Sequence, residues 1–184
     1  ANAATRQAAL ATAEAGREGT MSAHYVARRV SEAIAGREAL LLSERGCPMP
    51  AMTLAHHRAW FQEPHAGGLG WSFPAALGMQ LSEPDRLVVA TMGDGSYIFA
   101  NPVACHQIAE ALGLPVLVIV MNNAEWAAVR HSVTEIYPDG YASKTNRMPL
   151  TGLSPIPDFV KVAEASRAFA RKVETADALD RALQ

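Results

Sequence analysis

The chain has 184 residues, of which 49% are hydrophobic and 18% are charged, and its formal net charge is −2. This length and balance are typical of one globular domain with a sizeable core. The nearly neutral charge leaves no basic surface for nucleic acid or an anionic membrane, so we expect neither as a partner. The longest apolar run, residues 115–121, is too short to span a bilayer. There is no signal-peptide pattern, and Cys47 and Cys105 form no Cys-x-x-Cys motif, so we expect a reduced, cytoplasmic compartment.

The first 61 residues are predicted to contain a weak helix, an amphipathic helix, a strand and a further helix. Residues 1–19 are rich in Ala and have little to bury, which indicates a linker or arm from a preceding domain. Thr20 is placed to cap a helix that runs to about residue 34. Residues 39–43 (ALLLS) predict a buried strand, and residues 50–61 predict a further helix.

Two apolar runs of strand length lie in the middle of the chain, LVVATM (87–92) and PVLVIVM (115–121). Gly67-Gly68-Leu69-Gly70 opens a helix before the first run, and this helix continues to about Leu81. A second helix is predicted between the runs, because an N-cap residue, a first-turn proline and a terminating glycine are suitably spaced: Asn101, Pro102 and Gly113.

The last third of the chain alternates helices with one loop and one strand. A helix is predicted from residue 125 to about 135, and the four prolines of residues 137–157 indicate one long loop. PDFVKVAEASRA predicts a helix, FARKVE (169–174) a strand, and TADALDRAL a capped final helix. Because apolar strands alternate with helices, we expect a mostly parallel sheet between two helix layers, which is a three-layer α/β/α fold.

Polar residues follow two consecutive predicted strands. GDGS (93–96) comes directly after the first apolar run, and Asn122-Asn123 follows the second. Each motif alone is also typical of a surface turn. Because the crossover between them returns the chain to the same edge of the sheet, we expect their side chains to lie close together. Carboxylate and carboxamide oxygens suit Mg²⁺, and the neighbouring backbone N–H groups suit phosphate, so the residues predict a site for a magnesium-bound diphosphate.

The two motifs and their flanks resemble enzymes that depend on thiamine diphosphate (ThDP). The likeness runs through GGLGWSFPAALGMQLSEPDRLVVATMGDGS, PVLVIVMNNAEWAAVR and PDFVKVAEA, and covers roughly residues 20–170. The chain is similar to the C-terminal, diphosphate-binding domain of acetolactate synthase-like proteins and benzoylformate decarboxylases. This resemblance implies that residues 20–184 form that domain, with the ThDP-binding fold and with ThDP and Mg²⁺ as cofactors.

The resemblance also implies a role for the residues of both motifs. Asp94 would give the metal a carboxylate, Asn123 a side-chain oxygen and Glu125 its main-chain carbonyl. The side chain of Glu125 should then turn away from the anionic diphosphate, which it would repel. The remaining matched positions would contact the diphosphate: Gly46, Cys47, Gly95, Ser96, Trp126 and Ala127.

Other matched positions concern the shape of the cofactor and the substrate. Leu69 matches the bulky residue that holds ThDP in its bent conformation, and the Gly67 carbonyl would lie near the aminopyrimidine. Val129 matches a residue that lines the substrate pocket, although ordinary core packing is an equal alternative. His131 could face the substrate or the solvent. The resemblance assigns no catalytic residue to this chain, because the activating glutamate is expected on a pyrimidine-binding domain of the same or a partner chain.

The implied parent protein is a ThDP-dependent 2-oxo acid decarboxylase or carboligase, that is, a lyase or transferase that works as a homo-oligomer on a small 2-oxo acid. In this interpretation the chain is a fragment and is inactive alone. One alternative is a natural small subunit of a two-chain ThDP decarboxylase. Another is a non-catalytic binding or regulatory module of the same fold, although the absence of G-x-G-x-x-G and of a P-loop argues against a nucleotide-binding one.

Overall fold

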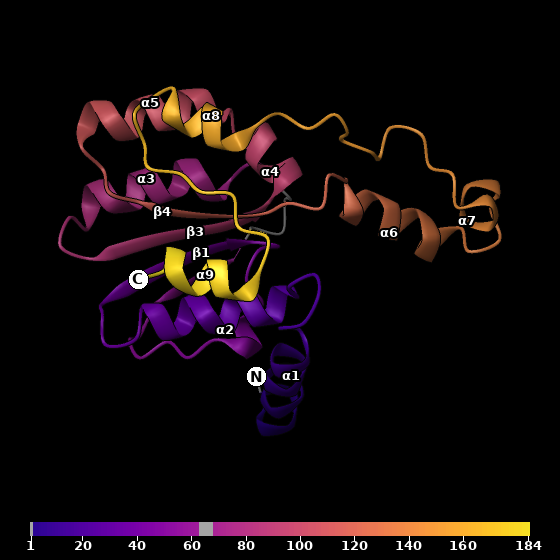
Figure 1. Ribbon diagram of the computed structural model, residues 1–184, viewed down its shortest axis with the longest axis horizontal. Coiled ribbons are helices and arrows are strands. Elements are labelled where there is room, and N and C mark those ends of the chain that lie inside the picture. Colours follow the sequence, from indigo (N-terminus) through magenta and orange to yellow (C-terminus); the bar gives the residue numbers. More distant parts are fainter. Residues whose placement is uncertain (1, 63–67) are drawn as a thin grey trace.

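A parallel four-stranded sheet forms the middle of the molecule (Figure 1). The computed structural model describes residues 2–62 and 68–184. The strands lie in the order β2-β1-β3-β4, and every neighbouring pair is parallel. Their bounds are β1 (Ala39–Glu44), β2 (Trp60–Gln62), β3 (Leu87–Gly93) and β4 (Leu117–Met121).

The two central strands, β1 and β3, carry the longest buried runs because helices cover both of their faces. In the ladder Glu44 lies opposite Met92, and Gly93 lies opposite Met121. The carboxyl ends of β1, β3 and β4 therefore meet at one edge of the sheet, as the crossover pattern predicted.

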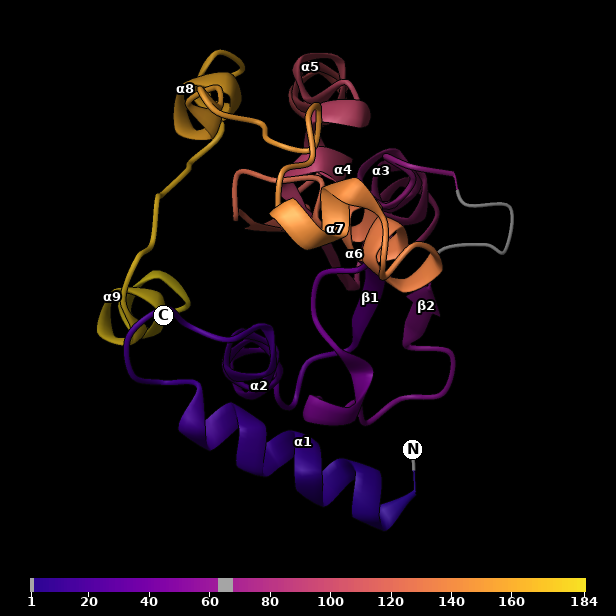
Figure 2. The same ribbon diagram turned by 90° about the vertical axis from the view of Figure 1, so that its right-hand side faces the viewer.

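Helices form a layer on each side of the sheet (Figures 1 and 2). The helices of one side are α3 (Ser72–Ser82), α4 (Asp94–Phe99), α5 (Pro102–Leu112) and α8 (Phe159–Glu164). Those of the other side are α2 (Ala23–Ala33) and α9 (Ala176–Ala182), with α1 (Ala3–Ala15) beyond α2. Each layer has its own core, one around Phe73 and Met92 and the other around Val30 and Leu41. The predicted three-layer α/β/α architecture is confirmed.

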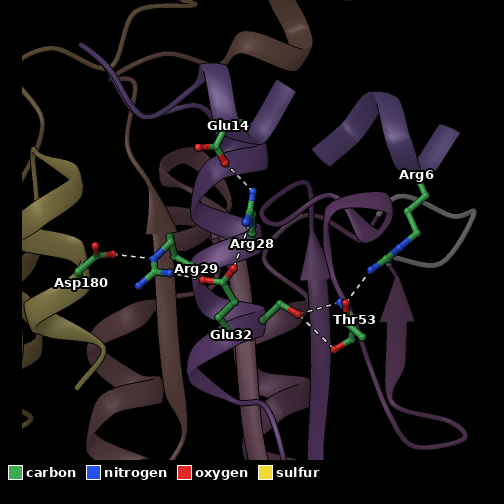
Figure 3. A network of polar contacts seen from close by, with 8 residues as sticks. Arg6, Glu14, Arg28, Arg29, Glu32, Thr53 and Asp180 are labelled. Carbon is green, nitrogen blue, oxygen red and sulfur yellow. Dashed lines mark hydrogen bonds and ion pairs between the residues drawn. The ribbon is translucent and has the colours of Figure 1, made fainter. Parts of the chain in front are cut away.

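The N-terminal helix α1 packs on the body of the domain. Ala9 and Ala13 are buried, and the Arg6 guanidinium donates to the Met52 carbonyl (2.7 Å). It also donates to the Thr53 hydroxyl (2.7 Å; Figure 3). The expected helix within residues 1–19 is therefore present and docked. The division between a linker and a domain at residue 19 stays a prediction.

Charged side chains join α2 to both of its neighbours in the same network (Figure 3). Arg28 pairs with Glu14 of α1 (2.7 Å), and Arg29 pairs with Asp180 of α9 (2.6 Å). Both arginines also pair with Glu32 on their own helix. Because these groups are partly exposed, the network fixes which helices meet more than it adds stability.

After β4 the chain leaves the body and forms an arm, residues 127–150. It contains α6 (Ala127–Ile136) and α7 (Tyr141–Thr145), which extend away from the sheet (Figure 1). Neither of these two described helices has a buried residue. Large apolar side chains are exposed along the arm: Val129, Ile136, Tyr137, Tyr141 and Leu150.

Two predicted elements are wrong. Residues 50–61 do not form a helix: a single 3₁₀ turn, η1 (Met49–Ala51), follows Pro48, and a second turn at residues 56–58, with Arg58 at φ of 56°, comes before β2. Prolines at positions 48 and 50 fix the start of a turn but do not supply the periodic apolar face that continues a helix. Residues 169–174 form no strand, because a strand requires a ladder partner and β4 pairs only with β3 among the described residues.

Smaller differences concern element ends. The cap of α2 is Ser22, which accepts from the Tyr25 N–H (3.1 Å), in place of Thr20. The segment after β3 is the helix α4, where the sequence suggested a turn. The predicted loop of residues 137–157 contains α7. No helix in the described parts of the chain has the length and apolar character needed to cross a bilayer.

Candidate functional site

Asp94 lies at the carboxyl end of β3, where it begins α4, and only 2% of its surface is exposed. Its Oδ1 accepts from the Gly95 N–H (2.8 Å), and its Oδ2 accepts from the Asn123 N–H (3.1 Å). A buried carboxylate requires such donors, because it has lost its water. The second bond joins the end of β3 to the loop after β4, so the two predicted motifs do meet.

The loop of residues 122–126 is held by its own side chains. Asn122 Oδ1 accepts from the Ala124 N–H, and Asn123 Oδ1 accepts from the Glu125 N–H, both at 3.1 Å. These are Asx turns, which hold the backbone in a compact path. Ala124 adopts a left-handed conformation, with φ of 55°.

A second segment holds this loop from the opposite side. The Trp126 N–H donates to the Thr151 carbonyl (2.7 Å), and the Leu153 N–H donates to the Ala124 carbonyl (2.8 Å). Glu125 and Gly152 form an antiparallel bridge between these two bonds. The chain that returns from the arm therefore supports the loop that carries Asn123.

The residues at these two strand ends carry a carboxylate (Asp94), a carboxamide (Asn123) and, two residues on, a main-chain carbonyl (Glu125). In the described ranges 2–62 and 68–184 there is no group of three or more His, Cys, Asp or Glu side chains that could hold a metal. A soft or borderline metal such as zinc prefers thiolate and imidazole ligands, which this site does not offer. One carboxylate with neutral oxygens is the donor set that fits Mg²⁺, which also takes phosphate oxygens and water.

The Trp126 ring lies directly over Gly95. A Cβ atom at Gly95 would come within 2.4 Å of two ring carbons, so only glycine permits this contact. The Trp126 and Ala127 N–H groups already have acceptors, Thr151 and, at 2.8 Å, the Glu125 carbonyl. Both N–H groups are engaged within the chain, and their contact with a diphosphate stays a prediction. The Gly95 N–H is also engaged, since it donates to Asp94 Oδ1, so contacts of Gly95 and Ser96 with a diphosphate stay a prediction as well.

Three predicted residues lie where the arm begins. The Glu125 carboxylate pairs with Arg130 (3.1 Å), so its charge is balanced locally. His131 pairs with Glu135 one turn along α6 (3.1 Å), and its side chain is 68% exposed. Val129 is also exposed, so it is not core in this chain. A substrate-facing role for Val129 and His131 stays a prediction.

Gly46 and Cys47 lie at the carboxyl end of β1. A Cβ at Gly46 would lie 2.4 Å from the Thr91 carbonyl carbon, so Gly46 is required by packing against β3. The Cys47 N–H donates to Thr91 Oγ1 (3.1 Å), and its thiol is buried, which raises the pKa of the thiol to about 12. The Cys47 side chain is therefore a neutral part of the core, which does not support the contact with the diphosphate that the resemblance implied.

Leu69 lies in the loop before α3 and is 43% exposed, whereas Gly67 lies outside the described residues. Glu44 has no role among the residues predicted from the motifs, but its carboxylate accepts from two N–H groups of this same loop. Glu44 ends a strand whose six residues are all buried, and this burial becomes evident only in the fold.

The chain matches the family described as "Thiamine pyrophosphate enzyme, C-terminal TPP binding domain" over residues 46–184. It is 35% identical over 127 residues to the acetolactate synthase large subunit of Haemophilus influenzae, which is 69% of this chain and 21% of that protein. It is 31% identical over 152 residues to an acetolactate synthase of Mycobacterium avium, which is 80% of this chain and 24% of the relative. The chain thus spans less than a quarter of the length of these two relatives.

Solved structures agree with these sequence matches. A ThDP-dependent 4-hydroxybenzoylformate decarboxylase from Rhodococcus jostii superposes with a TM-score of 0.71 at 29% identity, over 86% of this chain and 29% of that one. Benzoylformate decarboxylase from Polynucleobacter necessarius gives a TM-score of 0.72 at 27% identity, over 89% of this chain and 30% of that one. The chain therefore belongs to the thiamine pyrophosphate enzymes and carries their C-terminal, TPP-binding domain.

Proposed function

We propose that this chain is the magnesium–diphosphate-binding domain of a larger ThDP-dependent enzyme that decarboxylates or ligates small 2-oxo acids. The observation that carries the proposal is the bond between the Asn123 N–H and the buried Asp94 carboxylate. This bond holds the backbone of Asn123 against the Asp94 carboxylate, so the ends of β3 and β4 meet inside a domain of the ThDP family, which supports a shared metal site there. Relatives are acetolactate synthases and benzoylformate decarboxylases by name, and benzoylformate is itself a 2-oxo acid.

Each residue has a defined task in this proposal. Asp94, Asn123 and the Glu125 carbonyl would hold Mg²⁺, and Gly95 and Ser96 would bind the diphosphate through the first turn of α4. Arg130 keeps the Glu125 carboxylate paired, so that the anion meets less repulsion. Leu69 would support the bent cofactor. When bound, ThDP supplies a nucleophilic carbon and an electron sink for the loss of CO₂.

Activation of the cofactor requires a carboxylate within hydrogen-bond reach of the aminopyrimidine. We assign that glutamate to a pyrimidine-binding domain of the same or a partner subunit in a cytosolic homo-oligomer. The 184-residue chain alone is then expected to bind ThDP weakly and not to activate it. The check is hydrogen–deuterium exchange at the thiazolium C2: exchange much faster than in free ThDP would contradict this division of tasks.

The metal assignment is tested by calorimetric titration of ThDP in the presence and absence of Mg²⁺. Asp94→Ala and the volume-matched Asp94→Asn are both expected to abolish the Mg²⁺-dependent part of the affinity. Asp85→Ala is the matched control, because Asp85 is an exposed carboxylate that precedes the amino end of the same strand. Unchanged affinity in both folded Asp94 variants would overturn the assignment.

A further inference from the structure

The last residue of β1 is a buried acid whose carboxylate reaches into a different loop. Glu44 is 3% exposed. Its Oε1 accepts from the Gly70 N–H (2.7 Å), and its Oε2 accepts from the Ser72 N–H (2.9 Å). Ser72 begins α3, and the N-cap residue Trp71 makes no capping bond with its side chain. Glu44 therefore serves as the cap of α3 from a neighbouring strand, where a negative charge is also favourable.

The loop before α3 is also held by a close backbone contact between Gly70 and the end of α4. Gly70 has φ of +81°, and a Cβ atom there would lie 2.6 Å from the backbone nitrogen of Ala100. Its backbone therefore lies directly against the end of α4. Because α4 begins with Asp94 and has six residues, the loop lies within about 10 Å of the proposed metal site along that helix.

Leu69 is the residue immediately before this doubly fixed position. Its own side chain is 43% exposed, although the Gly70 backbone next to it is buried and hydrogen-bonded. The fixed backbone beside Leu69 therefore holds an apolar side chain that the domain core does not cover, which is what a group that supports a bound ligand requires.

We propose that Glu44 is a positioning residue: it fixes the backbone from which Leu69 presents its side chain to the cofactor. The proposal rests on the proposed function, since it requires a cofactor to lie against Leu69. Both Glu44 oxygens accept from backbone N–H groups of this loop, so the carboxylate acts on the backbone that precedes α3. Its effect on the reaction is exerted through the loop alone.

The first test uses the chain without cofactor and measures amide hydrogen exchange. Glu44→Gln keeps the volume of the side chain but places an NH₂ group, a donor, against one of the two N–H groups. We expect faster exchange at Gly70 and Ser72. The matched control is Gln80→Met at the other end of α3, where Gln80 Nε2 donates to the Glu83, Pro84 and Arg86 carbonyls. It should change exchange only in the turn after α3, at Glu83, Asp85 and Arg86, since Pro84 has no amide hydrogen.

The second test uses the complete enzyme, with benzoylformate and pyruvate as substrates. Glu44→Gln is expected to lower kcat by about tenfold to hundredfold, because small misplacements of a supporting group have effects of this size. The dissociation constant of ThDP with Mg²⁺ should stay within about twofold, the range for groups that act independently. The double variant Glu44→Gln/Leu69→Ala should have the kcat of Leu69→Ala alone. Gln80→Met should leave kcat unchanged.

The outcomes separate this inference from the proposed function. If the wild-type enzyme binds no ThDP with Mg²⁺, the proposed function fails and this inference fails with it. If ThDP binds but Glu44→Gln alters neither exchange at Gly70 and Ser72 nor kcat, only the positioning role of Glu44 fails. Losses that multiply in the double variant, or a missing limb of the pH–rate profile in Glu44→Gln, would also overturn it. Where Glu44→Gln does not fold, Glu44→Asp, which keeps the charge but withdraws it by one carbon, takes its place in every comparison.

Discussion

The chain after β3 stays inside the molecule, whereas the chain after β4 leaves it. Asp94, Gly95, Ser96 and Tyr97 are all buried at the start of α4. In contrast, the described helices α6 and α7 of the arm have no buried residue between them. The proposed cofactor site therefore has two parts that differ in burial. Residues 94–96 belong to the packed core, whereas the loop of residues 122–126 leads into the exposed arm.

This difference indicates how the site is assembled. The half on β3 is held by the core on both faces of the sheet, so it exists whenever the domain is folded. The half on the β4 loop depends on a few bonds: Asn123 to Asp94, Trp126 to Thr151, and Leu153 to Ala124. We expect substitutions in the sheet and its two helix layers to lower the free energy of global unfolding. Substitutions in the arm should change only how often the arm and the β4 loop open locally.

The largest expected effect is on global stability. Met92 on β3 is fully buried, so Met92→Ala should lower the free energy of unfolding by about 2–5 kcal/mol. Ile136 on the arm is 67% exposed, so Ile136→Ala should change it by less than about 0.5 kcal/mol. Urea denaturation of the two variants provides the measurement. Equal losses would mean that the arm belongs to the same cooperative unit as the sheet.

The contact between the Gly95 backbone and the Trp126 ring can be disrupted by adding one carbon atom, the Cβ of alanine, at position 95. Gly95→Ala should displace the Trp126 ring, with which the new Cβ would overlap, and lower stability by about 1–3 kcal/mol. Gly93→Ala is the control on the same turn, because no atom lies within 4 Å of its Cβ position. Trp126 fluorescence, assigned with Trp126→Phe, should shift to the red in Gly95→Ala alone. A shift of equal size in Gly93→Ala would argue against the ring contact.

A smaller effect is expected from pH. Burial lowers the pKa of His106, whose Nε2 lies 2.7 Å from the Tyr97 hydroxyl in the body. As the pH falls below the ordinary value of 6.5, the unfolded chain takes up this proton first, so folding stability falls and levels off only below the folded-state pKa. Urea midpoints measured from pH 7.5 to 5 should show a weaker pH dependence in His106→Gln. His131→Gln on the arm is the control, and an identical change there would contradict the assignment to His106.

The smallest expected effect is on the rate at which the thiols of Cys47 and Cys105 are alkylated. Burial raises the pKa of Cys47 to about 12 and also raises the pKa of Cys105. Because the thiolate is the reactive form, iodoacetamide at pH 8 should modify neither cysteine in the folded chain and both in urea. Mass spectrometry after brief labelling measures this directly. Labelling of Cys47 in the native chain would show that the carboxyl end of β1 opens as readily as the arm.

The sequence was most informative where local pattern and fold agree. Uniformly apolar runs predicted β1 and β3, and crossover geometry predicted that Asp94 and Asn123 would meet. It failed for residues 169–174, because strand formation depends on a partner that local propensity does not specify. It also missed Glu44, because the bonds to Gly70 and Ser72 span 26 and 28 residues and leave no local pattern.

The bond from Asn123 to Asp94 has a thermodynamic consequence. A ligand that engages both residues binds only the state in which the β4 loop is closed on the body, so ligand binding and local opening of the loop are linked equilibria. At a free concentration about 100 times its dissociation constant, such a ligand stabilises the closed state by about 2.7 kcal/mol. Proteases would then cleave the arm most slowly at a saturating concentration of the ligand. When the ligand is depleted, the loop would open more often and the arm would be cleaved faster.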